Sequence, residues 1–466
     1  MSRRLRTGGT LRENVATVLV AGVSSLFGVA LVESTVLITD AAGAAGVDGG
    51  SIGVAIAVVG AVFLLLAVYV GAVVTANTFA TVVAGRRRSI ALLRVLGAEA
   101  SIVRRSLAAE GLWLGALGAA AGLLVGVSAA SVTTAIGTAQ GWLPSARYDL
   151  LSPTLVGPVL IVVLTTWLAA WIGCRSVTAV SPLEATAAAA APAGATSRPR
   201  LRAGAMIALL LLGAGLLALG VVVGLRVPLG LLVAFVGGVL SFSGVLVGAG
   251  IIMPAVLALV GRTFGRAPAA RIAAANAARY PERSTRATMA LVIGVTLVTT
   301  FAVALTTYSD VTLAQLNDAP QWRAALGQTI SVTIVVFSVL AGFSALSAAV
   351  GLVNTLTVGM LQRIRELGLL RALGFSRGRL RGMILLEGAQ LTVAAIAFGL
   401  ALGILYGWVA AQSLLGSLVH DVIAPAVPWP MIGIIVGAGI LITAVSGIVA
   451  SRRAGSVSPV AALAVE

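Results

Sequence analysis

Lysine is absent from this 466-residue chain, and cysteine and histidine occur once each, as Cys174 and His420. A P-loop places a lysine on the nucleotide phosphates, so this chain cannot itself be a P-loop ATPase. A single cysteine excludes an internal disulfide, and one histidine without a cluster of ligands around it argues against a metal site. We therefore expect no catalytic residue, no cofactor and no metal in this chain.

Charge is also scarce, because only 10% of the residues are charged and 59% are hydrophobic. Soluble domains average about 25% charged residues. Apolar stretches long enough to cross a bilayer, about 18 residues or more, recur along the chain and indicate an all-α polytopic membrane protein. We expect about ten transmembrane helices, at roughly 13–33, 52–84, 107–136, 152–174, 203–225, 228–261, 287–309, 329–361, 383–415 and 429–451.

The basic residues, all 31 of them arginine, are distributed unevenly between the two sides of this topology. Only Arg147, Arg226 and Arg323 fall in odd-numbered loops, whereas the other 28 lie at the N-terminus or in even-numbered loops. The positive-inside rule then places both termini in the cytoplasm of a multi-pass protein of the plasma or inner membrane. The arginines sit in membrane-proximal loops rather than in one basic domain, so we expect the lipid bilayer and no nucleic acid as a partner.

An arginine-rich stretch occurs twice, at 86–111 and again at 363–388, and 10 of its 26 positions are identical. The constant shift in numbering between these two copies also aligns 77–185 with the second half of the chain without a gap, which is a duplication of a large unit. We therefore expect repeat 1 at 1–185, a cytoplasmic linker at 186–202, two additional helices at 203–262 and repeat 2 at 263–466.

Each repeat would contain four helices, and two inserted helices restore the original orientation, so the repeats are predicted to be parallel. The arginines before the first apolar run resemble a signal peptide. Cleavage there would leave repeat 1 one helix short, so we expect an uncleaved signal anchor instead. The outer loops near 34–51 and 309–328 are too short for a large extracytoplasmic domain.

Between the second and third helices of repeat 1, apolar and basic residues alternate in a helical pattern. Gly97 permits a stop, and a second short helix with Ile102, Val103 and Leu107 on one face is expected to follow. Such an amphipathic helix suits docking into a groove of a partner protein, or lying on anionic lipid headgroups. Repeat 2 follows the same plan, with Gly374 in place of Gly97.

Glu110 and Glu387 each stand near the predicted start of a helix. They could be stabilised there by the helix dipole, or they could form a polar latch between the loop and the helix. Small residues also recur every four positions on the third helix of each repeat, which allows close helix approach, either as ordinary packing or as a moving pair. These are Gly118, Gly122, Gly126, Gly399, Gly403 and Gly407.

The stretch RELGLLRALGFSRGRLRGMILLEG at 365–388 resembles the signature of FtsX-like permease domains, the membrane subunits of MacB/LolC-type, or type VII, ABC systems. The segment from Arg175 to Ala185 is similar to the end of such a domain. The resemblance implies four helices per domain, a coupling helix between the second and third, and a separate ATPase under each domain. The implied ATPase-coupling residues are Arg86, Arg88, Arg94, Gly97, Arg104, Arg363, Arg365, Glu366, Arg371, Gly374 and Arg381.

Two departures from the family pattern matter for function. Repeat 1 has Ser89 where repeat 2 has the usual acid, Glu366, and the large domain that MacB- and LolC-type permeases carry after the first helix is missing. The resemblance implies an ABC permease served by two copies of an ATPase subunit, which bind ATP and Mg, and export of an amphipathic or lipidic substrate. The alternative is a mechanotransmitter or sensor acting on an extracytoplasmic partner. Ion-coupled transport is disfavoured, because the spans carry few ionisable residues beyond Glu33.

Overall fold

The computed structural model describes residues 99–141, 153–178, 199–263, 281–315 and 376–456, most of 17–33, and single positions at 65, 69 and 73. The chain forms two compact units, Met1–Thr196 and Ser197–Glu466, and the boundary between them falls within the predicted linker. All regular secondary structure in the described part is helical, which confirms the expected fold class at that level.

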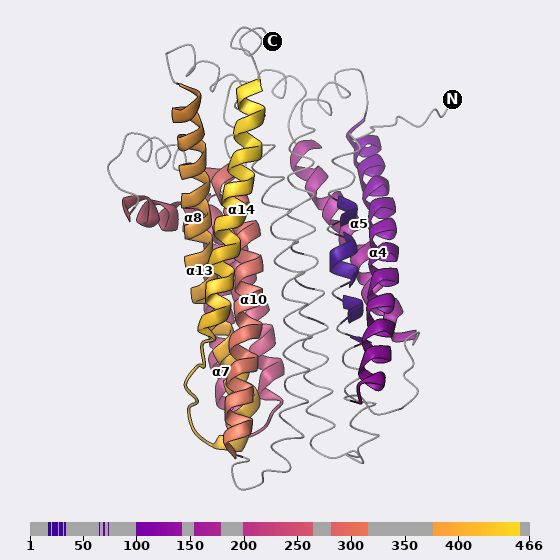
Figure 1. The fold of residues 1–466 in the computed structure, drawn as a ribbon, viewed down its shortest axis with the longest axis vertical. Helices are drawn as coiled ribbons and strands as arrows, with labels where there is room; N and C mark the ends of the chain where they lie inside the picture. Colours follow the sequence, from indigo (N-terminus) through magenta and orange to yellow (C-terminus); the bar gives the residue numbers. More distant parts are fainter. Residues whose placement is uncertain are drawn as a thin grey trace. The chain divides into compact units, whose positions relative to one another are not determined.

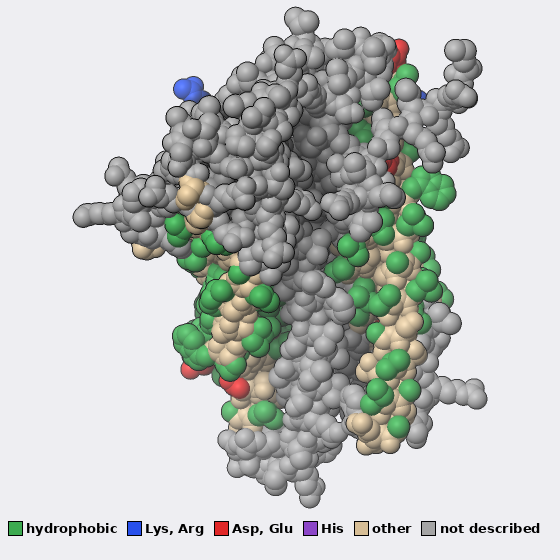
Figure 2. Space-filling view, turned by 45° about the horizontal axis from the view of Figure 1, so that its top comes forward, with side chains coloured by type: hydrophobic (Ala, Val, Ile, Leu, Met, Phe, Trp, Pro, Cys, Tyr) green, Lys and Arg blue, Asp and Glu red, His purple; other side chains and the backbone are tan. Residues whose placement is uncertain are grey.

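Six of the described helices are long and apolar enough to cross a membrane. Shorter apolar helices occur at Thr17–Ala30 and Trp429–Leu441. Together they coincide with eight of the predicted spans, while the predicted spans 52–84 and 329–361 lie outside the described residues. Among the described side chains visible in Figure 2, hydrophobic ones predominate and few are charged. This distribution is the one that a lipid environment requires.

The first unit contains the helix near Thr17–Ala30, α4 at Ala100–Ala139, the short η1 at Pro153–Leu155 and α5 at Val156–Thr178. Its small core contains Ala21 of the first helix, Ala119 of α4 and Val162 of α5. The Ser25 hydroxyl donates to the Ala119 carbonyl oxygen at 2.9 Å, which links the first helix to α4 within the apolar region. Hydrogen bonds of this kind hold helices together where hydrophobic attraction is weak.

The second unit begins with the hairpin of α7 at Pro199–Gly224 and α8 at Gly230–Thr263. The helices α10 at Pro281–Gln315, α13 at Arg377–Val419 and α14 at Trp429–Ser456 follow (Figure 1). The hairpin helices are closely apposed, since a Cβ added at Gly220 would meet the backbone of Ala234 at 2.6 Å. The last four residues of the predicted linker 186–202 lie in α7.

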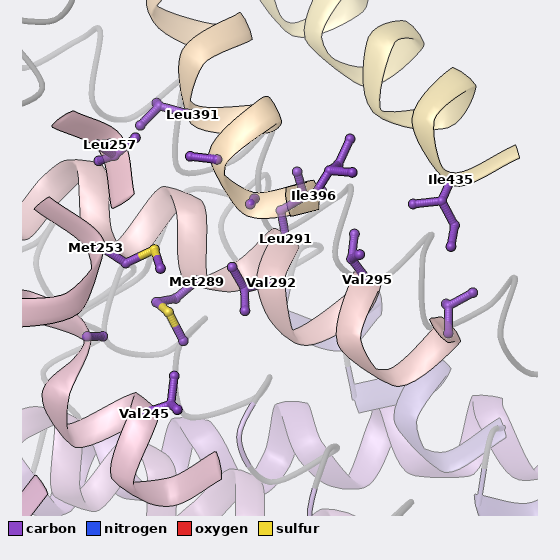
Figure 3. Close-up of a cluster of buried hydrophobic side chains, with 14 residues drawn as sticks. Val245, Met253, Leu257, Met289, Leu291, Val292, Val295, Leu391, Ile396 and Ile435 are labelled. Atoms are coloured by element: carbon purple, nitrogen blue, oxygen red, sulfur yellow. The ribbon is translucent and has the colours of Figure 1, made fainter. Parts of the chain in front are cut away.

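The main core of the second unit connects the hairpin to the helices that follow it (Figure 3). Met253 of α8 and Val292 of α10 are fully buried there, together with Ala394 of α13. Tyr406 of α13 adds a hydrogen bond of 3.0 Å with Ser241 of α8. The two additional helices thus pack on α10 and α13, within the same compact unit.

The third helices of the two repeats begin at matching positions. Helix α4 begins at Ala100 and α13 begins at Arg377, and these two residues are equivalent in the sequence repeat. The first helices are shifted relative to this alignment. Gly122 contacts Gly22 and Ser25, whereas its equivalent Gly399 contacts Val292 and Val295. Equivalent contact positions on the first and third helices therefore lie seven residues further apart in the sequence of repeat 2 than in that of repeat 1.

One local prediction was wrong. Ile102, Val103 and Leu107 do not form a separate short helix, since they lie in the first two turns of the 40-residue α4. Residues 377–384 are likewise continuous with the 43-residue α13. Val103 and Leu107 are buried against neighbouring helices. No proline or glycine lies between Gly97 and Leu107, so the helix continues into the apolar run.

Candidate functional site

The start of α4 is the best described part of the predicted ATPase-coupling region. Of the coupling residues, only Arg104 and Arg381 lie in described helices, α4 and α13. The remaining nine lie outside the described residues: Arg86, Arg88, Arg94, Gly97, Arg363, Arg365, Glu366, Arg371 and Gly374.

Glu99 marks the change from extended backbone to helix, with φ −64° and ψ 142°. The amides of Ile102 and Val103 donate to its carbonyl oxygen at 3.1 and 3.2 Å, and its carboxylate accepts from the Ser101 hydroxyl at 3.1 Å. No side chain caps the free amides of this helix end. The helix therefore begins directly after Glu99, within the arginine-rich stretch 86–111.

Arg104 anchors this helix end to α5. Its guanidinium carbon lies 3.7 Å from the ring centroid of Trp171, a cation–π contact that contributes about 0.5–2 kcal/mol. Val103 and Leu107 are buried beside it, whereas Ile102 is 51% exposed. Trp171 was not among the predicted site residues, although a tryptophan and an arginine at the same predicted ends of neighbouring helices could have indicated the pair. Position 448, its equivalent in repeat 2, is isoleucine.

The predicted latch residues lie deeper in their helices than expected. Glu110 is ten positions beyond the start of α4, and Glu387 is ten beyond the start of α13. Both side chains are half-buried. The favourable effect of the helix dipole on a carboxylate is limited to the first turn, so it cannot account for either residue. A role that links each helix to its surroundings remains a prediction.

The six predicted packing glycines all lie where helices approach closely. Gly118, Gly122 and Gly126 of α4 face residues 18–29 of the first helix. Gly399, Gly403 and Gly407 of α13 face residues 292–303 of α10. A Cβ added at Gly407 would lie 2.7 Å from the Thr300 carbonyl oxygen, so no side chain fits there. In both units the third helix of the repeat therefore packs directly on the first.

Polar side chains of α13 and α10 hold the segment between α13 and α14, and none of them was among the predicted site residues. We call residues His420–Pro428 the return segment. Gln412 of α13 donates to the Asp421 carbonyl oxygen at 2.9 Å and accepts from the Ile423 amide at 2.7 Å. Trp408 donates to the Ile423 carbonyl oxygen at 2.7 Å, and the Ala426 amide donates to Thr307 of α10 at 3.0 Å. The sequence could have indicated this cluster, because Gln412 is a polar residue within an apolar run.

No group of three or more potential metal ligands occurs within the described ranges. The arrangement of those residues offers helix ends, helix contacts and a fixed loop. Such features can transmit movement along helices.

The profile described as FtsX-like permease C-terminal matches the chain twice, at residues 61–182 and 338–459. The two matches cover just over half of the chain, and they are related by the same shift in numbering as the two arginine-rich stretches. The chain belongs to the FtsX-like permease family. The resemblance predicted from the repeated arginine-rich stretch is thereby confirmed.

Two curated relatives are similar to part of this FtsX-like permease. YknZ of Bacillus subtilis, described as an uncharacterised ABC transporter permease, is 25% identical over 152 residues. The macrolide export ATP-binding/permease protein MacB of Rhodopirellula baltica is 28% identical over 152 residues. Each alignment covers 33% of this chain, and 36% and 21% of the respective relative. The chain therefore matches only a minor part of either relative.

Proposed function

We propose that this FtsX-like permease is the membrane subunit of an ABC system and works with separate ATPase subunits. The observation that carries the proposal is the double family match. Each matched segment contains an arginine-rich stretch that continues into a long helix, α4 or α13. Two equivalent contact points on one chain suit two copies of an ATPase. ATP and Mg would be bound by those subunits, since this chain has no lysine for a P-loop.

We further propose ten transmembrane helices, arranged as two parallel four-helix repeats with the α7–α8 hairpin between them. The matching starts of α4 and α13 support the repeat, and the arginine distribution supports cytoplasmic termini in a plasma or inner membrane. The arginine-rich stretches then face the cytoplasm, where an ATPase can reach them.

The helix lengths suggest how movement would be transmitted. Helix α4 has 40 residues, which corresponds to about 60 Å, twice the roughly 30 Å of the hydrocarbon core. A displacement at its first turns would therefore be carried through the membrane by one continuous helix. The glycine contacts would pass that displacement to the first helix of the repeat, since close-packed helices have no space to yield.

Export of an amphipathic or lipidic substrate is the activity that we favour. Its support is the apolar, poorly charged surface of the described helices, which gives a lipid-like molecule a route along the protein (Figure 2). Mechanical control of an extracytoplasmic partner is the second candidate, and the continuous 40-residue helix α4, which can carry movement across the membrane, is the observation that favours it.

The test is reconstitution of the chain in nanodiscs with its cognate ABC ATPase, followed by measurement of ATP hydrolysis. Arg371→Glu should abolish the stimulation of hydrolysis by the permease, whereas Arg226→Glu, in the α7–α8 turn, serves as the matched control and should retain it. Full stimulation in Arg371→Glu would contradict the coupling role. Hydrolysis that rises with added lipidic substrates supports export, and hydrolysis that responds to none of them favours the mechanical candidate.

A further inference from the structure

The return segment has no helical or strand structure, yet its backbone is bonded to two helices along its length. Gln412 is fully buried and uses both ends of its amide, one on the Asp421 carbonyl oxygen and the other on the Ile423 amide. Fixing the backbone of each residue costs about 1–2 kcal/mol in conformational entropy. The loop between α13 and α14 (Figure 1) is held by four side-chain hydrogen bonds, so it is a fixed element of the fold rather than a simple connection.

Repeat 1 has no equivalents of the two α13 side chains that fix this segment. At the equivalent positions of the sequence repeat, Ser131 replaces Trp408 and Ala135 replaces Gln412. The Ser131 hydroxyl donates to the carbonyl oxygen of Ser128 within its own helix, and alanine has no polar side chain. The side chains that fix the segment are therefore specific to repeat 2, and family membership, which applies to both repeats, does not explain them.

The position of the return segment along the membrane normal follows from its contact with α10. Residues 287–309 of α10 are uncharged and span about 34 Å, close to the roughly 30 Å of the hydrocarbon core. Thr307, which accepts from Ala426, lies in the last turn of this stretch, one turn before the exposed Asp310. The return segment thus crosses the protein at the level where hydrocarbon gives way to headgroups.

The exposed side chains at this level are mainly apolar. Leu418, Val422 and Trp429 are 60%, 68% and 75% exposed. Asp421 carries the only formal charge of the segment, and its carboxylate accepts a hydrogen bond from the Val422 amide at 2.7 Å. Tryptophan and apolar side chains with few charges are the composition found at membrane interfaces. A surface that docks a soluble protein at this depth would have to compete with lipid headgroups.

We propose that the return segment is a preformed interfacial element of repeat 2, which rests on the headgroup layer of the bilayer and is held there by Gln412. With the orientation under "Proposed function", that layer is the outer leaflet. A lipidic substrate leaving the helices on this side meets a fixed apolar edge in repeat 2. The assignment of the leaflet and of the substrate rests on the proposed function, whereas the contact with headgroups does not.

The test uses the scarcity of cysteine. Cys174→Ala provides a cysteine-free chain, into which Val422→Cys introduces a spin label in phosphatidylcholine–phosphatidylglycerol nanodiscs without ATPase. Collision of the label with oxygen and with a water-soluble nickel complex gives a depth parameter that is positive in lipid and negative in water. Leu211→Cys, on an exposed part of α7, is the reference for the hydrocarbon core.

We expect a positive depth parameter at position 422, smaller than that at 211. Gln412→Ala should reverse its sign and increase the mobility of the label, whereas Gln390→Ala, which removes another buried glutamine of α13, should leave both unchanged. Trp408→Phe removes only the indole donor and should shift the parameter in the same direction by less, so the proposal stays testable if Gln412→Ala does not fold.

A negative parameter in the otherwise unaltered chain would overturn the proposal, because the segment would then stand in water, as a docking surface for an extracytoplasmic protein must. A positive parameter that neither Gln412→Ala nor Trp408→Phe changes would overturn the role of Gln412. Both results concern the chain without an ATPase, so they are independent of whether ATP hydrolysis is coupled to it.

Discussion

Gly403 is the position where a single methyl group should reveal how closely α10 and α13 pack. A Cβ at this position would lie 2.5 Å from the Thr299 Cβ and 2.9 Å from the Thr296 carbonyl oxygen. Both threonines are buried, so neither has space to move aside. Gly403→Ala should therefore force the two helices apart by a fraction of an ångström.

The magnitude follows from comparison with a glycine that has open space around it. At Gly215 of α7, a Cβ would meet no atom of a neighbouring element within 4 Å. Gly215→Ala therefore reports only the helix preference of alanine, about 1 kcal/mol. Overpacking in a well-packed core costs about 1–3 kcal/mol. Since the helix preference is common to both variants, Gly403→Ala should be less stable than Gly215→Ala by about 1–3 kcal/mol.

The assay is the free energy of unfolding in bicelles, measured by steric trapping for the unaltered chain and both variants. Gly122→Ala, the equivalent position of α4, should behave like Gly403→Ala, because its Cβ would meet the backbone of residues 22 and 26. Equal stability of Gly403→Ala and Gly215→Ala would refute the reasoning, since it would mean that α10 and α13 are not in direct backbone contact.

Three other predictions test separate contacts. The hydrogen bond between Tyr406 and Ser241 should show a coupling of about 0.6 kcal/mol in a double-mutant cycle of Tyr406→Phe and Ser241→Ala; additive effects would argue against it. Trp171→Leu should speed amide hydrogen exchange in the first two turns of α4, because Arg104 loses a contact of about 0.5–2 kcal/mol; unchanged protection would disprove that anchoring role. In a cysteine-free background, Leu92→Cys should react with an impermeant thiol reagent only from the cytoplasmic side, and labelling from outside would overturn the topology.

The hydrophobic runs predicted most of the described fold, because a single chain segment in lipid can satisfy its own backbone hydrogen bonds only as a helix. They could not predict where α4 begins. Residues 100–107 are polar enough to lie outside the membrane, and only the burial of Val103 and Leu107 against neighbouring helices shows that they continue the helix. The same error placed Glu110 at a helix start, where the dipole would have explained it.

The site was predictable where the sequence repeats and unpredictable where the repeats differ. The glycine positions were found because small residues at a spacing of four have one physical use in membrane helices. Trp171, Gln412 and Thr307 have no counterpart at the equivalent positions of the other repeat, so no repeated pattern marks their contacts. The seven-residue shift of the first helix is equally invisible, because helix contacts rather than identities define it.

The central claim is that one chain offers two contact points to ATPase subunits. Native mass spectrometry of the chain with its cognate ATPase, in a non-hydrolysing ATP-bound state, tests it most directly. We predict a complex of one permease chain with two ATPases, and loss of ATPase subunits in Arg371→Glu. A complex that contains two permease chains with one ATPase on each, or full occupancy in Arg371→Glu, would contradict the claim.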